Sequence, residues 1–319
     1  MTTGATVHRP VLLKETLEAL SVHRSGRYID ANLGGGGHTE AILTASSPDG
    51  VVLGIDADAQ AIEATRDRLA TFGDRLRTFH GSSARLSEAA DAVDFDAVDG
   101  VIFDLGLSSD QLVDRTRGFG IRAGGTLDLR FDVSRGESAA DLLGYLDVRE
   151  LQALFRNYGE EPYAPRIARA IVAARATAPI TTSEQLSALV EAAVPKRYGP
   201  PSRIHPATRV FQALRIAVND ELGALRIALA AALSRLSVGG RVAVLTYHSL
   251  EDRIVKQAFA AAVRGCICPP RLPACACGLQ PTIRLVNKKP ITASPEEIAE
   301  NPRSRSAKLR VAERLAVAA

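Results

Sequence analysis

The chain has 319 residues, of which 46% are hydrophobic and 24% are charged. These proportions are typical of a folded globular protein and exclude a disordered one. The length corresponds to one large domain or two moderate ones. The formal net charge of +3 excludes a histone-like basic protein, but residues 264–319 alone carry ten Lys and Arg against four Glu, a net +6 that leaves −3 for the rest. A local basic surface is therefore compatible with the small total.

Neither a secretion signal nor a membrane span is expected. Lys14 and Glu15 interrupt the apolar residues near the N-terminus, and no window reaches the ~18 apolar residues of a membrane helix. All four cysteines lie between residues 266 and 277, so they cannot join distant parts of the chain as the disulfides of a secreted protein do. We expect a cytoplasmic protein.

Strand and helix patterns alternate in the first third of the chain, which is typical of a parallel sheet covered by helices. The expected strands are residues 27–33, 51–56, 75–79 and 99–104, and the expected helices are residues 38–45 and 59–71. A glycine-rich loop follows at residues 115–126, and residues 139–194 have a helical pattern almost throughout.

The alternating pattern returns after a linker at residues 195–206. Residues 208–236 predict one long helix or a broken pair, stopped by Gly239-Gly240. They are followed by a strand at 241–247, a helix at 251–263 and strands at 282–286 and 308–314. We therefore expect one α/β domain made of residues 1–115 and 206–319, with a helical insertion at residues 116–205. The alternative, two domains in series, would leave the late strands without a sheet to join.

The strongest local signal is a glycine loop within residues 30–39, Asp-Ala-Asn-Leu-Gly-Gly-Gly-Gly-His-Thr, between a strand and a helix. Such a loop lets backbone N–H groups approach a ligand at a helix N-terminus. Asp56 ends the next strand, at a spacing suited to a carboxylate that accepts from ribose hydroxyls. The dinucleotide fingerprint fails because Thr39 or Glu40 stands where its last glycine belongs, so the loop fits S-adenosylmethionine better than a nicotinamide cofactor. The alternative is a glycine turn without a ligand.

Asp104 ends the fourth expected strand. Ligands of open α/β sheets bind beside the carboxyl ends of the strands, so Asp104 is expected near the reacting centre. Its alternative role is to cap the turn that follows.

The cysteines form a C-x-C…C-x-C pattern. Four sulfur atoms within twelve residues of a cytoplasmic chain indicate a zinc site, although C-x-C is tighter than the usual C-x2-C. Reduced thiols in a loop are the alternative. The ligands would be Cys266, Cys268, Cys275 and Cys277.

Longer blocks carry a family resemblance. They are Arg117-Gly-Phe-Gly, Leu127-Asp-Leu-Arg-Phe-Asp132, Tyr158-Gly-Glu-Glu161, His205-Pro-Ala-Thr-Arg-Val-Phe-Gln-Ala-Leu-Arg-Ile-Ala-Val-Asn-Asp-Glu-Leu222, Tyr247-His-Ser-Leu-Glu-Asp-Arg-Ile-Val-Lys256 and Asn301-Pro-Arg-Ser-Arg-Ser-Ala-Lys-Leu-Arg310. In this order the chain resembles the bacterial 16S ribosomal RNA cytosine-N4 methyltransferase family, also called the MraW or RsmH family, from about residue 8 to residue 314.

This resemblance implies a class I S-adenosylmethionine-dependent methyltransferase fold with an inserted helical domain, which we assign to substrate recognition. It implies methylation of a decoding-centre cytidine in 16S rRNA of the small ribosomal subunit. The cofactor positions carried over are Gly36, Gly37, His38, Asp56, Ser83, Asp104 and Gln111. The family often has Phe where Ser83 stands, so contact with the adenine is expected from the backbone or an edge.

The chemistry needs an acceptor that prepares the cytosine N4, whose lone pair is delocalised into the ring. Asp104 or the Leu105 carbonyl is our first candidate, and His248, which follows the strand at 241–247, is the second. A structural hydrogen bond is the alternative role of His248. The target base is expected to leave its stack.

Two basic stretches are expected to contact RNA phosphates, with solvated charge as the alternative. Their candidate residues are Lys196, Arg197, Arg203 and Arg209 in one stretch, and Arg303, Arg305 and Lys308 in the other. Aromatic residues make up only 5% and Trp is absent, so recognition by shape and phosphate is expected rather than base stacking. The remaining alternatives are a methyltransferase for another nucleic acid or a small molecule, and an RNA-binding relative without catalysis. Homodimerisation stays open.

Overall fold

The computed structural model describes residues 10–121, 125–195, 205–269, 274 and 276–316. The predicted site residues Lys196, Arg197, Arg203 and Cys275 lie outside these ranges. The chain divides into two compact units, one formed by Met1–Gly106 with Leu222–Ala319 and the other by Leu107–Glu221. Each unit has its own apolar core.

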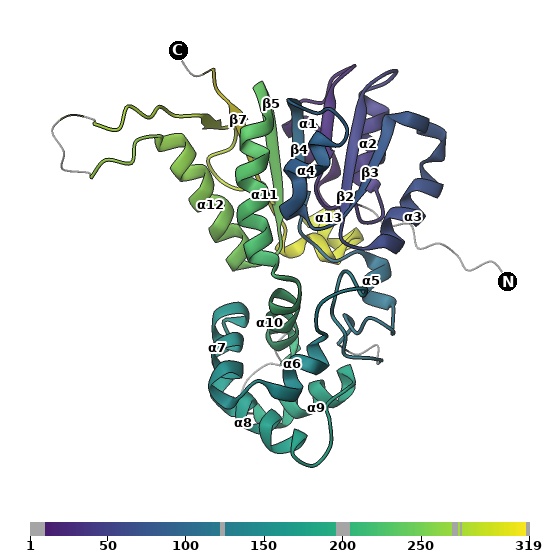
Figure 1. The fold of residues 1–319 in the computed structure, drawn as a ribbon, viewed down its shortest axis with the longest axis vertical. Coiled ribbons are helices and arrows are strands. Elements are labelled where there is room, and N and C mark those ends of the chain that lie inside the picture. Colours follow the sequence, from purple (N-terminus) through teal and green to yellow (C-terminus); the bar gives the residue numbers. More distant parts are fainter. Residues whose placement is uncertain (1–9, 122–124, 196–204, 270–273, 275, 317–319) are drawn as a thin grey trace. The chain divides into compact units, whose positions relative to one another are not determined.

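The first unit is built on a seven-stranded sheet (Figure 1). Its strands are β1 (Arg27–Asp30), β2 (Val51–Asp56), β3 (Leu76–His80), β4 (Val98–Asp104), β5 (Leu236–Thr246), β6 (Ile283–Leu285) and β7 (Lys308–Arg314). Their order is β3-β2-β1-β4-β5-β7-β6. The first five strands are parallel, whereas β7 runs antiparallel to both β5 and β6. The late strands therefore join the same sheet as the early ones, which excludes two domains in series.

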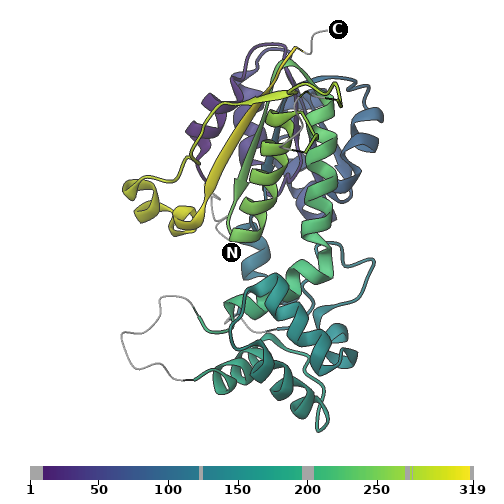
Figure 2. The ribbon, with the colours of Figure 1, turned by 90° about the vertical axis from the view of Figure 1, so that its left-hand side faces the viewer.

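Helices cover both faces of this sheet. They are α1 (Leu13–Leu20), α2 (Gly37–Ala45), α3 (Ala59–Arg68), α4 (Leu86–Asp91), α11 (Glu221–Arg235), α12 (Ser249–Arg264) and α13 (Pro295–Glu300), with short 3-10 helices at Ala70–Arg75, Ser83–Arg85 and Pro302–Ser306. Helices α1 and α2 pack on one face through a cluster that includes Ile42, Ile102 and Leu245. Helices α4, α11 and α12 lie on the opposite face (Figures 1 and 2). Strands β2 and β4 are apolar runs because both of their faces are covered.

The strand order, with an antiparallel β7 inserted between β5 and β6, is that of the class I methyltransferase sheet. The expected fold class is confirmed. In the described part of the chain, no helix combines the length and the apolar character needed to span a bilayer.

The second unit is helical. It contains α5 (Ser109–Val113), α6 (Ala139–Tyr145), α7 (Val148–Gly159), α8 (Ala164–Arg175), α9 (Ser183–Ala193) and α10 (Thr208–Asn219). Ser138, Asp147 and Thr182 begin three of these helices with reciprocal capping boxes. The apolar faces meet in one cluster around Leu151, Phe155, Ile167 and Leu214.

Helix α10 belongs to this second unit, although the sequence-based division placed residues 206–221 with the sheet. The reason is close packing between α7 and α10. A Cβ on Gly159 would lie 2.5 Å from the Arg209 carbonyl oxygen, so the glycine lets the two helices approach.

The helix predicted at 208–236 is a broken pair. Asp220, with φ 46°, ends α10 in the left-handed region. Helix α11 then ends at Arg235, before the two glycines that were expected to stop it. Gly239 and Gly240 lie inside β5, where the pairing with β4 shifts register between Val98 and Gly100. A Cβ on Gly240 would lie 2.9 Å from the Val98 carbonyl oxygen, so this irregular pairing requires glycine there.

Candidate active site

The glycine loop follows β1 and leads into α2. Gly34 and Gly36 have φ values of 47° and 72°, which favour glycine. A Cβ on Gly36 would lie 2.4 Å from Thr65 Cγ2. The Thr65 hydroxyl donates to the Gly34 carbonyl at 2.8 Å, and the Arg68 guanidinium donates to the Gly35 carbonyl at 2.8 Å. Two side chains of α3 thus fix the glycine loop by hydrogen bonds to the carbonyl groups of the loop. The first-turn N–H groups of α2, which lack intrahelical acceptors, favour a negative ligand group.

Asp56 ends β2 and faces the glycine loop. One carboxylate oxygen accepts from the Gly34 N–H at 2.7 Å, and the other accepts from the Asp58 N–H at 2.8 Å. Burial raises the pKa of Asp56 to about 6, against the lowering effect of these two N–H donors. Each oxygen keeps a further lone pair. The side chain is therefore able to accept from two hydroxyl groups of a ligand.

Asp104 ends β4, and His38 in α2 lies beside it. His38 is 5% exposed, and its Nδ1 lies 3.4 Å from Asp104 Oδ2 while its Nε2 lies 3.1 Å from the Val11 carbonyl oxygen. Two acceptors facing the two ring nitrogens favour the doubly protonated imidazolium. Burial lowers the pKa of His38, but the Asp104 carboxylate outweighs it and raises that pKa above its ordinary value.

Asp30 adds a third charge to this cluster. It is 1% exposed at the end of β1 and accepts from the Thr39 hydroxyl at 2.7 Å and from the Asn32 N–H at 3.2 Å. Burial raises the pKa of Asp30, and the nearby His38 lowers it. His38 therefore interacts electrostatically with two carboxyl groups that stand at the carboxyl ends of neighbouring strands, β1 and β4.

Tyr247 follows β5 and closes the cluster from the other side. Its hydroxyl donates to Asp104 Oδ1 at 2.6 Å. Burial and the Asp104 charge together raise the pKa of Tyr247 well above its ordinary value. Tyr247 also packs on Gly106, where a Cβ would lie 2.8 Å from its ring. The tyrosine is a neutral donor that fixes one side of the Asp104 carboxylate.

His248 begins α12 as its N-cap. Its Nδ1 accepts from the Glu251 N–H at 3.5 Å, and its Nε2 lies 3.0 Å from Glu251 Oε1, at an angle too poor for a hydrogen bond. Glu251 is 2% exposed, and its carboxylate accepts hydrogen bonds from the backbone N–H groups of Tyr247 and His248. This reciprocal arrangement is a capping box with His in the place of Ser or Thr. The structural role considered for His248 is thus present.

The other predicted cofactor residues are divided between the two units. Ser83 begins a 3-10 helix three positions after the end of β3, and the Gly81 N–H between them donates to the Asp56 carbonyl at the end of β2, at 2.8 Å. Gln111 lies in α5 of the second unit, where its side chain accepts from the Ser108 N–H at 3.1 Å.

The predicted RNA-contacting residues are divided in the same way. Arg209 lies in α10 of the second unit, and its guanidinium donates to the Glu160 carbonyl at 3.4 Å. Arg303 and Arg305 lie in the 3-10 helix before β7, Arg305 exposed and Arg303 close enough to lower the pKa of Tyr247. Lys308 contacts Asp252 at 3.4 Å and shares it with Arg310. The charge of Lys308 is therefore partly compensated within the protein.

Four polar residues of this site had no assigned role in the sequence: Asp30, Thr39, Tyr247 and Glu251. Two signals were available. Asp30 and Tyr247 stand at the ends of strands, where ligand contacts concentrate. Glu251 stands three residues after the His248 cap, at the capping-box spacing. No local sequence pattern indicates the contacts that these side chains make with residues from other strands and helices.

The family model and the relatives of similar sequence agree on one family. A family model described as the MraW methylase family matches residues 5–315. The ribosomal RNA small subunit methyltransferase H of Thermomicrobium roseum is 52% identical over 312 residues, which cover 98% of this chain and 95% of that protein. The protein of the same name from Citrifermentans bemidjiense is 50% identical over 308 residues, 97% of this chain and 98% of its own. Among solved structures, an rRNA methylase from Streptococcus thermophilus covers 98% of this chain and 100% of that chain, at 13% identity and a TM-score of 0.41.

The family match extends over nearly the whole chain and includes every strand of the sheet. The curated relatives match it at about half of all positions and along nearly their entire length. The resemblance derived from the sequence blocks is confirmed, and this chain belongs to the MraW methylase family.

Proposed function

We propose that this enzyme transfers a methyl group from S-adenosylmethionine to the N4 of a decoding-centre cytidine in 16S rRNA of the small ribosomal subunit. The observation that carries the proposal is the polar cluster on Asp104, beside the glycine loop of a methylase-family chain. The name of the relatives, ribosomal RNA small subunit methyltransferase H, supports an rRNA substrate.

The residues around the loop fit the cofactor. A Cβ on Gly35 would meet no atom within 4 Å, so the loop offers open space for a ligand beside the start of α2. Asp56 has acceptor capacity for two ribose hydroxyls, and Gly36, Gly37 and His38 form the first turn of α2 or its cap. When bound, S-adenosylmethionine supplies an activated methyl group on a sulfonium. Ser83 and Gln111 remain proposed contacts.

Asp104 is the proposed acceptor for the cytosine amino group. With the cofactor bound, N4 would take up the methyl carbon as its bond to sulfur breaks, and the proton that N4 loses would pass to the Asp104 carboxylate or to water. A carboxylate that accepts from the amino group draws the lone pair out of conjugation with the ring and orients it. The contacts with His38 and with the Tyr247 hydroxyl hold the Asp104 carboxylate in one orientation for this task. Orientation of this kind supplies about 7–11 kcal/mol of a bimolecular barrier.

The Leu105 carbonyl is the alternative acceptor next to Asp104, and His248 is the second side-chain candidate. His248 contacts Glu251 and caps α12, so a substitution there is expected to lower stability as well as activity. We therefore rank Asp104 first. A His248→Asn variant, which preserves a capping side chain, separates the two roles. Activity that follows only the melting temperature would restrict His248 to a structural role.

RNA contact is proposed on both units. Residues 116–205 would recognise the folded substrate, with Arg209 and, outside the described residues, Lys196, Arg197 and Arg203. Arg303, Arg305 and Lys308 would contact phosphates beside the Asp104 cluster, which is supported by the proximity of Arg303 to Tyr247. We further propose action in the cytoplasm, where ribosomal subunits are assembled. Homodimerisation is tested by sedimentation of the purified chain.

The test is methylation of small ribosomal subunits from a strain that lacks the family's gene. Purified protein and labelled S-adenosylmethionine are added, and the modified nucleotide is mapped by nuclease digestion and mass spectrometry. We expect one N4-methylated cytidine in the decoding centre, and its absence with Asp104→Asn. Label in another RNA or in a small-molecule fraction would favour a different substrate. Binding of subunits without transfer would indicate a non-catalytic relative.

A further inference from the structure

One cluster of chemically reactive side chains lies outside the proposed active site. It belongs to residues 265–282, here called the cysteine loop, which joins α12 to β6. The two ends of this loop touch. The Thr282 N–H donates to the Ala262 carbonyl at 3.0 Å, and a Cβ on Gly265, with φ 63°, would lie 2.3 Å from the Gln280 carbonyl carbon. The base of the loop is therefore closed by its own backbone.

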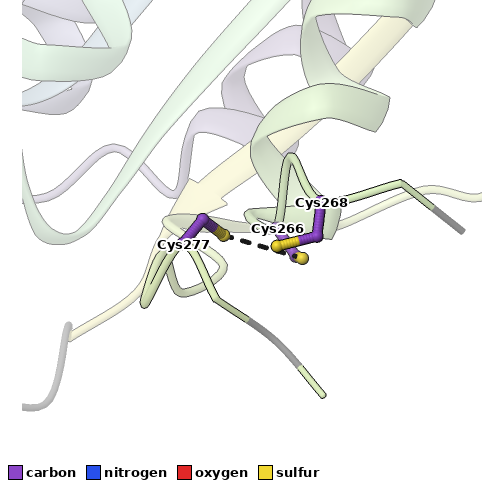
Figure 3. A group of neighbouring side chains, drawn as sticks. All are labelled: Cys266, Cys268 and Cys277. Carbon is purple, nitrogen blue, oxygen red and sulfur yellow. Dashed lines mark hydrogen bonds between the residues drawn. The ribbon is translucent and has the colours of Figure 1, made fainter. Parts of the chain in front are cut away.

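The cysteine loop brings three sulfur atoms together. The Sγ atoms of Cys266, Cys268 and Cys277 all lie within 4.8 Å of one another, and Cys266 and Cys277 are 3.7 Å apart (Figure 3). Two thiolates bound to one tetrahedral zinc at ~2.3 Å are ~3.8 Å apart. The spacing of Cys266 and Cys277 thus equals the separation that a shared tetrahedral metal requires.

Two further observations fit bound thiolates. The Ala276 backbone N–H points at Cys268 Sγ at 3.3 Å, a contact that stabilises negative charge on sulfur. All three cysteines are partly exposed, which leaves a path for an ion to enter. Three thiolates at this spacing repel one another unless a cation lies between them.

We propose that Cys266, Cys268 and Cys277 bind one zinc ion, which fastens the C-terminal end of α12 to the segment before β6. Binding replaces three S–H bonds by three Zn–S bonds and releases three protons to solvent. Zinc is favoured because thiolate ligands in tetrahedral geometry select it and no redox change is needed. The fourth position is open to water or to another donor; Cys275, part of the same sequence pattern, lies outside the described residues. The role is structural and does not depend on the methyl transfer.

The experiment measures metal in the full-length protein, purified with zinc in the medium and without chelator. We expect about one zinc per chain by plasma mass spectrometry. Cys266→Ser and Cys268→Ser should lower zinc at least tenfold after dialysis against a weak chelator. Ile267→Ser is the matched control, since this residue lies between the two ligands and is 72% exposed. It should retain the wild-type zinc content.

A second measurement uses only the wild-type protein, so it tests the proposal even if the cysteine variants fail to fold. The wild-type protein is stripped of zinc and titrated with Co²⁺ under reducing conditions, which should produce thiolate-to-cobalt charge-transfer absorption and the visible bands of a tetrahedral ion. Zinc below about a tenth per chain together with no such absorption overturns the proposal. So does a mass two hydrogens lower without reductant, which would mean a disulfide. Equal zinc in Cys268→Ser and Ile267→Ser would also overturn it.

Discussion

Tyr247 and Asp104 are 143 positions apart in sequence, yet the tyrosine hydroxyl donates to the carboxylate at 2.6 Å. The contact forms because β4 and β5 are neighbours in the sheet, and Asp104 and Tyr247 stand at the carboxyl ends of these two strands. His38 approaches the other carboxylate oxygen from α2. The two oxygens of the Asp104 carboxylate are thus contacted by different side chains, one by the His38 ring and the other by the Tyr247 hydroxyl.

Removal of the tyrosine hydroxyl tests whether this orientation matters. We expect Tyr247→Phe to lower kcat about tenfold or more, because a hydrogen bond to a charged group contributes about 1.5–3 kcal/mol. The Kd for S-adenosylmethionine should change far less. Tyr145→Phe, which removes an exposed hydrogen bond to Glu137 at 2.9 Å, is the matched control. Equal kcat values for the two variants would contradict an orienting role.

The charge of His38 should depend on Asp104. The carboxylate raises the pKa of the imidazole and burial lowers it. Asp104→Asn removes the strongest influence that raises this pKa and leaves those of Asp30 and the Val11 carbonyl, so the pKa of His38 should fall. NMR titration of the His38 ring signals in the wild type and in Asp104→Asn measures this change. An unchanged His38 titration would exclude the ion pair.

The same shift has a consequence for stability. Because the folded-state pKa of His38 is raised, its contribution is fully present below the unfolded-state value of 6.5 and is lost as the pH rises through the folded-state value. Denaturant unfolding of the wild type should therefore show a loss of stability across that window. Asp104→Asn should show a smaller loss, because the strongest influence that raises the pKa of His38 is removed.

Cofactor binding should weaken in acid because of Asp56. Its pKa of about 6 means that the carboxylate is protonated in part of the sample below that pH. Protonation removes acceptor capacity for the ribose, so we expect the Kd to rise about tenfold between pH 7 and pH 5. Calorimetry at several pH values measures it. Asp56→Asn should bind weakly at every pH, and a wild-type Kd that stays constant would refute the assignment.

Acid should weaken cofactor binding through Asp56, but through the same residue it should increase the free energy of unfolding. The raised pKa means that ionised Asp56 opposes folding above pH 6 or so, and this cost is relieved as the pH falls towards the ordinary value of 3.8. A carboxyl group kept at such a cost is typical of a functional site.

The glycine loop offers two substitutions with different expected results. Gly36→Ala requires a residue with a Cβ to adopt φ 72°, and it places that Cβ 2.4 Å from Thr65 Cγ2. We therefore expect the free energy of unfolding to fall by about 2 kcal/mol or more. Gly35→Ala meets no neighbouring atom and should retain the wild-type stability, while its methyl group obstructs a ligand. Thermal unfolding and cofactor Kd, measured on both, separate the effects. Equal melting temperatures would contradict the strain at Gly36.

The regular elements could be predicted where local signals agree. Strands 51–56 and 308–314 have the predicted bounds, because a buried apolar run or an alternating pattern ends at charged residues. The start of β5 was predicted five residues too late, since Gly239-Gly240 was interpreted as a stop. Only pairing with β4 reveals that a glycine pair can continue a strand through an irregular register.

The sequence predicts which residues stand at the site, but it does not predict the contacts between their side chains. Asp56 and Asp104 follow from strand ends, which local patterns locate. The His38–Asp104–Tyr247 arrangement depends on which strands are neighbours and on how α2 sits on the sheet, and one sequence does not specify these. The two N–H donors on Asp56 likewise come from loop geometry.

The basic residues before β7 provide a test of RNA contact. Arg305 is exposed, whereas Arg310 pairs with Asp252 at 2.7 Å, so Arg305 is the better candidate for a phosphate. Arg305→Gln should raise the KM for ribosomal subunits and reduce the slope of log KM against log salt by about 0.7–1, the value for one lost phosphate contact. Arg66→Gln removes an exposed charge from α3 and should leave both quantities unchanged. If the two variants have the same salt slope, phosphate contact at Arg305 is excluded.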